Sequence, residues 1–280
     1  MAISSKRSAE NIDLDDAATL ELFPGSKHWS LAHKEAGFKA QWHCWHEDPK
    51  FDMTDPSYVY NDLIPMIVKP PPHRKRRFVS LQIGIECTTY STMTGSIYRT
   101  KCEPEGTSQA LAHPRRGPKV RNANLYSDHG IDAWLAADSV GTFASIENPQ
   151  GSRLWHTKRM KPLMQRVSEG SLWLCKTSFC KWGRPFRGTR WVLANYPEIM
   201  MIERHCTHTT HAGILAAHSI PTQEANPYPK ALCRQWAQIT KLAMASRGGQ
   251  SLDSTLHSEF VGGAQWTILR WENAAALMRI

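Results

Sequence analysis

The segment from residue 18 to residue 48 constrains the fold more than any other part of the sequence. An apolar stretch, ATLELF, begins at Ala18 and is followed by the glycine turn PGSKH and by WSLAHKEAGF, whose apolar residues recur at near-helical spacing up to Gly37. A second strand is predicted at KAQWHCW, which leads directly into Glu47 and Asp48. The order strand, glycine turn, helix, strand and acid is typical of the start of a doubly wound nucleotide-binding fold.

The rest of the chain indicates the same fold class. Strands are predicted at FVSLQIGIE, TFASIEN, LWLCKTSF and RWVLAN, and helical stretches alternate with them. This alternation predicts an α/β domain with a doubly wound, mostly parallel, Rossmann-like sheet. Residues 92–125 are rich in Gly, Pro, Arg and Lys and predict a long loop, whereas DAWLAADSVG predicts a helix that ends at Gly141.

Three regions are expected along the chain. Residues 1–18 are polar and predict a flexible arm, residues 19–200 hold the α/β domain, and residues 201–280 predict a small helical region, with histidines and cysteines, packed on it. The proline-rich basic connector at 69–77, KPPPHRKRR, has three interpretations: a solvated loop, a phosphate contact or a nuclear import signal.

The net charge indicates the kind of binding partner, and the cysteine usage indicates the cellular compartment. The 280 residues carry a net charge of +9 and a pI near 9.3, which favours a polyanion such as nucleic acid. Seven irregularly spaced cysteines argue against a secreted disulfide framework. The N-terminal segment lacks the apolar run of a signal peptide, and no stretch of about 18 apolar residues occurs. We therefore expect an intracellular protein in a reducing compartment, nuclear if its source is eukaryotic, with no membrane partner.

The glycine turn carries the first resemblance to a known family. LELFPGSKHWSLAHKEAGF resembles the first motif of the cytosine-5 DNA methyltransferases, F-x-G-x-G followed by a helix ending in A-G-[FY], which binds S-adenosyl-L-methionine. The resemblance implies that Phe23 and Gly25 contact this cofactor. Lys27 stands where the second glycine of the motif belongs, and we expect its side chain to crowd the methionine portion of the cofactor.

Three acids follow at positions where such folds bind a nucleoside. An acid after the second strand of the fold bonds the ribose hydroxyls, so Glu47 or Asp48 is a candidate, with a surface acid in a turn as the alternative. The family resemblance implies that Asp62, in YNDLIPM, contacts the adenine amine.

A cysteine at the end of a strand is the candidate nucleophile. IGIECTTYS resembles the catalytic loop of the same family, P-P-C-x-x-[FY]-S, in which a thiolate adds to C6 of cytosine. The resemblance implies this role for Cys87; the alternative is a cysteine that only packs in the core. Glu86 replaces the proline before the nucleophile, and a carboxylate at this position is expected to disfavour the thiolate.

Two later segments complete the resemblance. SIENPQGSRLW resembles the Glu-Asn motif, which implies that Glu147 binds or protonates N3 of a flipped cytosine. FCKWGRPFRGTRWVLAN resembles the later arginine motif, which implies that Arg187 and Arg190 clamp the base and the DNA backbone. The four segments occur in family order over about residues 19–233, as in a divergent viral or phage-like branch that lacks a large target-recognition domain.

A run of histidines raises the question of a metal. In HCTHTTHAGILAAH, the side chains suited to zinc are Cys206, His208, His211 and His218, and Cys233 could complete a site. Their spacing matches no standard zinc finger, so a surface histidine cluster is the alternative.

Two functions therefore remain at the level of sequence. One is S-adenosylmethionine-dependent transfer of a methyl group to C5 of cytosine in DNA through a covalent adduct with Cys87; RNA is an alternative substrate, because a related branch of the family methylates tRNA. The other is a catalytically impaired, methyltransferase-like protein that binds nucleic acid or acts as an accessory module. Glu86 and Lys27 favour the second function, whereas the retained Cys87 and Glu147 favour the first.

Overall fold

A computed structural model describes the protein at residues 14, 16–70, 77–211 and 227–247. Residues 1–13 and 15 of the expected N-terminal arm lie outside these described residues, as do most of the basic connector and a large part of the region expected over 201–280. None of the helices in the described ranges combines the length and the apolar character that crossing a bilayer requires.

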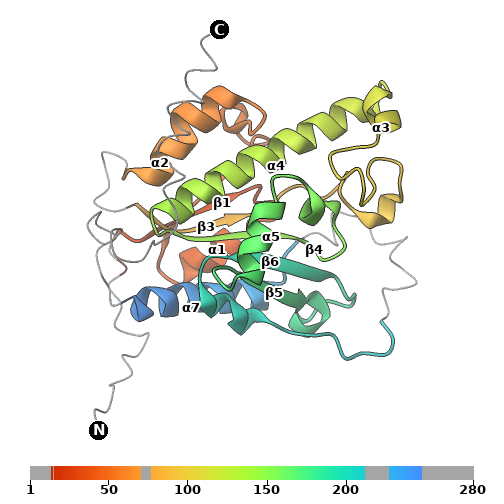
Figure 1. Cartoon of the computed structure of the whole chain (residues 1–280). Helices are drawn as coiled ribbons and strands as arrows, with labels where there is room; N and C mark the ends of the chain where they lie inside the picture. The colour runs from red at the N-terminus through yellow and green to blue at the C-terminus, as the bar shows by residue number, and fades with distance from the viewer. Residues whose placement is uncertain (1–13, 15, 71–76, 212–226, 248–280) are drawn as a thin grey trace.

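A single sheet of strands β1–β6 forms the centre of the molecule (Figure 1). The strand order is β2-β1-β3-β4-β6-β5. Strands β2, β1, β3 and β4 pair in parallel, whereas β6 is antiparallel to both β4 and β5. The bounds are β1 (Ala18–Leu22), β2 (Lys39–His43), β3 (Phe78–Ile83), β4 (Phe143–Pro149), β5 (Trp173–Ser178) and β6 (Thr189–Ala194). This confirms the predicted mostly parallel α/β sheet.

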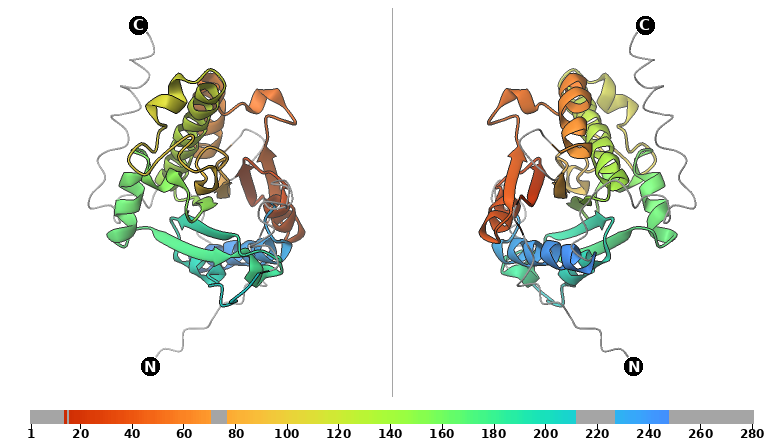
Figure 2. Two further views of the ribbon diagram at one scale, coloured as in Figure 1. Left: turned by 90° about the vertical axis from the view of Figure 1, so that its right-hand side faces the viewer. Right: turned by 90° about the vertical axis from the view of Figure 1, so that its left-hand side faces the viewer.

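Helices cover both faces of the sheet (Figures 1 and 2). On one face α4 packs over β3 and β4, and Leu20, Leu81 and Trp134 belong to one buried cluster. On the other face α1 packs against α7, and Trp29 and Trp236 belong to a second cluster. The α-helices are α1 (His28–Glu35), α2 (Ile64–Val68), α3 (Ser108–Ala112), α4 (Arg116–Ser139), α5 (Lys161–Ser168) and α7 (Lys230–Ser246). Helix α7, from the region expected to begin at residue 201, thus shares a core with the sheet.

Short helical turns connect these elements. They are η2 (Pro49–Phe51), η4 (Thr92–Thr94), η5 (Arg153–His156), η6 (Phe179–Trp182) and η7 (Pro197–Ile202), together with the π-helical turn η3 (Tyr58–Leu63). Burial explains why β1 and β3 were readable from sequence: every residue of both strands is buried, as a parallel strand covered on two faces requires.

The prediction of a long loop over residues 92–125 is wrong for its second half. Helix α4 begins at Arg116 and runs to Ser139, so it includes most of the shorter helix that the sequence predicted. Pro118 lies in its first turn, where the backbone N–H has no helical partner and proline costs little. Gly117 fits a close approach, because a Cβ there would lie 2.4 Å from the carbonyl oxygen of Leu111. Both residues belong to the start of a helix, although glycine and proline are typical of loops.

The buried guanidinium of Arg99 ties the segment after β3 to helix α4. Arg99 is 1% exposed. Its Nε and Nη2 donate to the hydroxyl of Thr89 at 3.1 and 3.0 Å, and its Nη1 donates to the side-chain oxygen of Asn124 at 2.7 Å. The guanidinium also donates from Nη1 to the carbonyl oxygen of Pro104 (2.7 Å) and from Nη2 to that of Val120 (3.1 Å). Arg99 therefore anchors the loop that follows Cys87.

We expect Arg99→Met to lower the free energy of unfolding by about 3 kcal/mol, because the substitution leaves several buried acceptors without a donor. Urea unfolding followed by circular dichroism measures this loss. Arg121→Met is the matched control, because Arg121 is exposed and donates one bond, to the carbonyl of Leu111; its expected effect is within about 0.5 kcal/mol. Equal losses in the two variants would contradict the anchoring role of Arg99.

Candidate active site at the carboxyl edge of the sheet

The site lies where the chain leaves β1 and β3. The strand order β2-β1-β3 means that the connections after β1 and β3 run to opposite sides, so this pair of strands forms a switch point. In open α/β sheets, ligands bind outside the carboxyl ends of the strands at such a point. The turn Phe23–Lys27 follows β1, and the segment that leads to Cys87 follows β3. Strand β4 is the parallel neighbour of β3 and carries Glu147 close to its own carboxyl end.

The turn after β1 has an unusual backbone. Phe23, Gly25 and Lys27 adopt φ values of 57°, 48° and 58°, which lie in the left-handed region. This conformation costs a residue with a side chain roughly 1–2 kcal/mol, so the strain at Phe23 and Lys27 must be offset by the surrounding structure. A Cβ at Gly25 would meet no atom within 4 Å, so open space adjoins the turn. A strained turn that faces open space at a helix N-terminus is suited to binding a ligand through its backbone.

Lys27 turns towards Glu47. Its ammonium group forms an ion pair with Oε1 of Glu47 and lies 4.9 Å from the ring centre of Trp42. Trp42 Nε1 donates to the other oxygen of Glu47 at 3.1 Å. Hydrogen bonds from Lys27 and then Trp42 lower the pKa of Glu47. The residue that was expected to crowd the cofactor is therefore paired with the acid that was expected to bind the ribose.

The other two acids are placed differently. Asp48 accepts from the backbone N–H of Lys50 at 3.2 Å, and the Lys50 ammonium lies 2.7 Å from its other oxygen, so Asp48 caps η2. The hydrogen bond from Lys50 is the main reason that the pKa of Asp48 is lowered. Asp62 is exposed on the π-helical turn η3, and none of the described contacts joins it to the turn after β1. Of the three acids, Glu47 is thus the one that a described contact joins to the turn.

Glu147 and Arg190 form a buried pair across β4 and β6. Arg190 Nε lies 2.9 Å from Glu147 Oε1, and the two side chains are 14% and 9% exposed. The N–H is not aimed at this oxygen, so Oε1 is buried without a hydrogen-bond donor. Burial raises the pKa of Glu147, whereas Arg190 and then Tyr228 act to lower it. A buried acceptor without a donor is costly, so a ligand that bonds it would be favoured.

Cys87 lies within the electrostatic reach of this pair. Burial is the main cause that raises the pKa of its thiol; Arg190 lowers the pKa, and Glu147 raises it. Glu86 acts in the expected direction but is the weakest of these influences, because its side chain is exposed. The carbonyl oxygen of Cys87 accepts from the backbone N–H of Ser91 at 2.8 Å, which closes the turn after the nucleophile. Arg187 is exposed in the connection between η6 and β6, and no described contact joins it to Cys87 or Glu147.

Tyr228 joins the site from a distant part of the chain, and no motif predicted it. Its hydroxyl donates to Glu147 Oε2 at 2.8 Å and accepts from Gln82 Nε2 at 3.2 Å. His28 Nδ1, at the start of α1, lies 2.7 Å from the Tyr228 carbonyl oxygen and donates to it. A Cβ at Gly84 would lie 3.0 Å from the Tyr228 hydroxyl, so the glycine permits this close approach. Tyr228 thus connects helix α1, strand β3 and strand β4.

The candidate zinc ligands lie together in another place. Cys206, His208 and His211 converge with Cys180, which follows β5 and was not predicted. The suggestion that Cys233 completes this site is wrong: Cys233 is fully buried in the core that α7 shares with the sheet. His218 lies outside the described residues.

Comparisons with known proteins give only distant similarities. No protein-family model and no curated protein matches the sequence. Among solved structures, the Entamoeba histolytica methyltransferase EhMeth is similar with a TM-score of 0.36 and 11% identity, over 64% of this chain and 52% of that one. The S. pombe Dnmt2 methyltransferase is similar with a TM-score of 0.36 and 13% identity, over 70% and 56%. The chain thus spans about half the length of either structure, and neither similarity assigns it to a family.

The buried carboxyl of Glu21 beneath the turn gives a prediction for the pH dependence of folding. Glu21 accepts from the backbone N–H and the hydroxyl of Ser30, at 3.0 and 2.5 Å, and burial raises its pKa from 4.5 to about 7. Because the folded protein holds this proton to a higher pH than the unfolded chain, its contribution to stability is fully present below pH 4.5 and is lost as the pH rises towards 7.

Between about pH 5 and pH 7.5, wild-type protein is expected to lose about 2 kcal/mol of stability relative to Glu21→Gln, whose amide does not titrate. Urea unfolding of both proteins at the two pH values measures the difference. Parallel pH dependence of the two proteins would contradict the raised pKa of Glu21.

Proposed function

We propose that this protein is an S-adenosyl-L-methionine-dependent methyltransferase that modifies C5 of cytosine in DNA through a covalent adduct with Cys87. The observation that carries the proposal is the Glu147–Arg190 pair at the carboxyl end of β4, the strand next to β3, together with the effect of both charges on the pKa of Cys87, which follows β3. A thiol, a carboxyl group and a guanidinium are the three groups that nucleophilic attack on a pyrimidine needs: a nucleophile, a partner for the ring nitrogen and a cation.

The turn after β1 fits the cofactor. Open space adjoins Gly25, the N-terminus of α1 follows directly, and half-exposed Glu47 lies within reach of Lys27 beside it. In this proposal Phe23 and Gly25 line the methionine portion, Glu47 binds the ribose hydroxyls, and Asp48 and Asp62 are further candidates for the nucleoside. When bound, S-adenosylmethionine supplies a methyl group on a positively charged sulfur, which is electrophilic.

Cys87 and Glu147 divide the chemistry on the base. The Cys87 thiol loses its proton to solvent, and the thiolate forms a bond to C6 while the C5–C6 double bond opens, which places an electron pair on C5. Arg190 is the cation that favours the thiolate, since it lowers the pKa of Cys87. Burial raises the pKa of Glu147, which suits this carboxyl to donating a proton to N3 of cytosine. After C5 has taken the methyl group, loss of the C5 proton to solvent, cleavage of the C6–sulfur bond and return of the N3 proton to Glu147 restore the aromatic ring, the carboxyl group and the Cys87 thiolate.

Tyr228 and Arg190 act on the orientation of Glu147. The Tyr228 hydroxyl donates to Oε2, and Arg190 lies beside Oε1, so the carboxyl plane is held from two sides. Oε1 has no hydrogen-bond donor in the described structure, so this oxygen is the one assigned to the base. The target cytosine must leave its stack to reach it, and the net charge of +9 supports a nucleic-acid substrate.

A non-catalytic nucleic-acid-binding protein is the second candidate, and one contact favours it. The ion pair between Lys27 and Glu47 engages the acid that a nucleoside would need, and burial raises the pKa of the Cys87 thiol. In this alternative the fold and the positive charge are retained without cofactor binding. Cofactor affinity and adduct formation separate the two functions.

The first test is covalent trapping. With S-adenosylmethionine and an oligonucleotide that contains 5-fluorocytosine, wild-type protein is expected to form a denaturation-resistant adduct, because C5 then carries fluorine in place of the proton whose removal releases Cys87. DNA and RNA oligonucleotides of the same sequence identify the substrate, and intact-mass spectrometry measures the adduct. Cys87→Ser is expected to form no adduct, whereas Cys102→Ser, which changes an exposed cysteine, is expected to trap like wild type. Trapping by Cys87→Ser would rule out the assigned nucleophile.

The second test is cofactor binding by calorimetry. Lys27→Gly is expected to bind S-adenosylmethionine on the order of tenfold more tightly than wild type, because glycine adopts the left-handed backbone without strain and frees Glu47. Lys39→Gly is the control, since Lys39 pairs with Asp16 at the start of β2. If neither wild type nor Lys27→Gly binds the cofactor at about millimolar concentration, the methyltransferase proposal fails and the non-catalytic function remains.

A further inference from the structure

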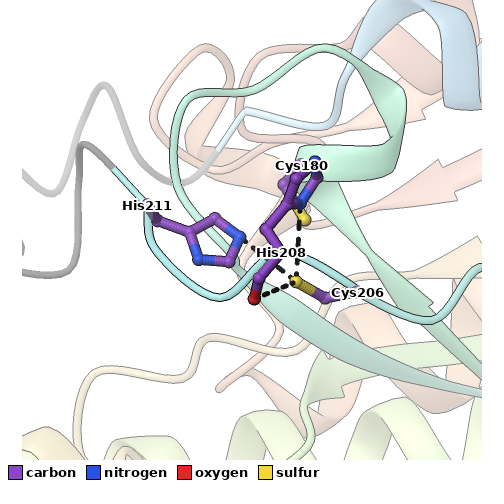
Figure 3. Close-up of side chains that lie close together, drawn as sticks. All are labelled: Cys180, Cys206, His208 and His211. Atoms are coloured by element: carbon purple, nitrogen blue, oxygen red, sulfur yellow. Dashed lines mark hydrogen bonds between the residues drawn. The ribbon is translucent and has the colours of Figure 1, made fainter.

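Four metal-binding side chains meet at one point beyond the end of β5 (Figure 3). They are Cys180, Cys206, His208 and His211, and one ligand atom from each lies within 4.8 Å of all the others. Cys206 Sγ lies 3.2 Å from His211 Nε2 and 3.6 Å from His208 Nδ1. Figure 3 shows the four side chains pointing toward one another from two loops.

Both the ligand types and the spacing fit zinc. Two thiolates and two imidazoles form one of the standard tetrahedral zinc sets. With zinc–sulfur and zinc–nitrogen bonds of about 2.3 and 2.0 Å, tetrahedral geometry places sulfur and nitrogen ligands about 3.5 Å apart. The distances from the Cys206 sulfur to the two histidine nitrogens, 3.2 and 3.6 Å, lie on either side of this value. We propose that Cys180, Cys206, His208 and His211 bind one structural Zn²⁺ ion.

The main chain already brings the two ligand loops together. The backbone N–H of Ser178 donates to the carbonyl oxygen of Arg204 at 2.9 Å, and the N–H of Arg204 donates to that of Lys176 at 3.2 Å. These bonds place residues 204–211 beside the end of β5 and the turn η6, which carries Cys180. Lys181 adds a hydrogen bond from its ammonium group to the Thr207 hydroxyl at 2.7 Å. The ligands therefore approach through backbone pairing that does not involve their own side chains.

The second loop has little else to hold it. Residues 204–211 include no buried side chain: Cys206 and His211 are half-buried and the others are exposed. Ordering a segment that buries no apolar side chain costs conformational entropy that no hydrophobic contact offsets. The binding free energy of a four-ligand metal site can offset this cost. Four protein ligands leave no open position for a substrate, so the ion has a structural role rather than a catalytic one.

The ion would stabilise one wall of the candidate active site. Cys180 follows Phe179, whose ring lies 4.8 Å from the guanidinium carbon of Arg190 and meets the ring of Tyr228 edge-on at 6.3 Å. Arg184, in the same loop, donates to the carbonyl oxygen of Pro227 at 3.0 Å. Zinc at Cys180 therefore fixes the loop against which Arg190 and Tyr228 pack. The site itself does not depend on the proposed methyl transfer.

The first measurement is the zinc content of the purified full chain by mass spectrometry of the metal. We expect one zinc per chain in wild type and less than about a fifth of that in Cys180→Ser, Cys206→Ser and His211→Gln, since loss of one of four ligands strongly weakens a structural site. His205→Gln and Cys102→Ser are matched controls, because neither residue belongs to the cluster, and both variants should keep their zinc. Equal zinc content in ligand variants and controls would overturn the site.

A second measurement uses wild-type protein alone, so it tests the site even if a ligand variant fails to fold. Wild-type protein is stripped with a chelator and titrated with Co²⁺, whose tetrahedral thiolate complexes give charge-transfer and d–d absorption bands. We expect these bands at one equivalent, their loss on adding zinc, and a higher melting temperature with either metal. If Cys180 and Cys206 instead form a disulfide, peptide mapping without reductant shows the two peptides linked. That result, or an absence of cobalt bands in reduced protein, would overturn the zinc site.

Discussion

The ion pair between Glu147 and Arg190 is the interaction on which the candidate site depends. Strand β6 runs antiparallel to β4, with Arg190 opposite Pro149, so a residue near the start of β6 meets the carboxyl end of β4. A parallel neighbour would bring its own carboxyl end to the same edge, and its first residues would lie at the opposite edge. The reversed strand is thus what places a guanidinium beside Glu147. Removing either partner of such a buried pair leaves an uncompensated charge, which typically costs 3–5 kcal/mol.

Several features of this edge of the sheet are unfavourable for stability and are held by neighbouring packing. Phe23 and Lys27 have left-handed backbones, and Oε1 of Glu147 is buried without a hydrogen-bond donor. Opposing these costs, Arg99 anchors the loop after Cys87, and Tyr228 joins α1, β3 and β4 through three hydrogen bonds. Strain and unsatisfied polar groups concentrate at functional sites because the rest of the fold over-determines them there. The distribution of strain in this protein supports a ligand at this edge.

Local sequence patterns were sufficient to predict the sheet and part of the candidate site. The strand, turn and helix from Ala18 onward were readable because burial on both faces makes β1 an uninterrupted apolar run. Glu147 was readable because an acid within a buried strand is rare. Helix α4 was interpreted in part as loop because Gly117 and Pro118 look like loop residues and their place in a first helical turn depends on tertiary contacts.

Long-range contacts explain what the sequence could not reveal. Tyr228 meets Glu147 from 81 positions away, and its own neighbours in the sequence carry no motif. Cys180 joins Cys206 only because Ser178 pairs with Arg204, and this pairing has no local signal. The partner of Lys27 could not be predicted from sequence either. Its side chain was expected to enter the cofactor space, but it pairs with Glu47, which follows β2.

The reactivity of Cys87 tests most directly whether the thiol, Glu147 and Arg190 share one site. The rate of alkylation of Cys87 by iodoacetamide, followed by peptide mass spectrometry across a range of pH, reports its pKa without requiring cofactor or substrate. Relative to wild type, Glu147→Gln should move the midpoint to lower pH and Arg190→Met should move it to higher pH, because the carboxylate raises this pKa and the guanidinium lowers it. Exposed Cys102 in the same samples should not change. Unshifted midpoints for Cys87 in both variants would show that the three groups do not act on one another and would contradict the site.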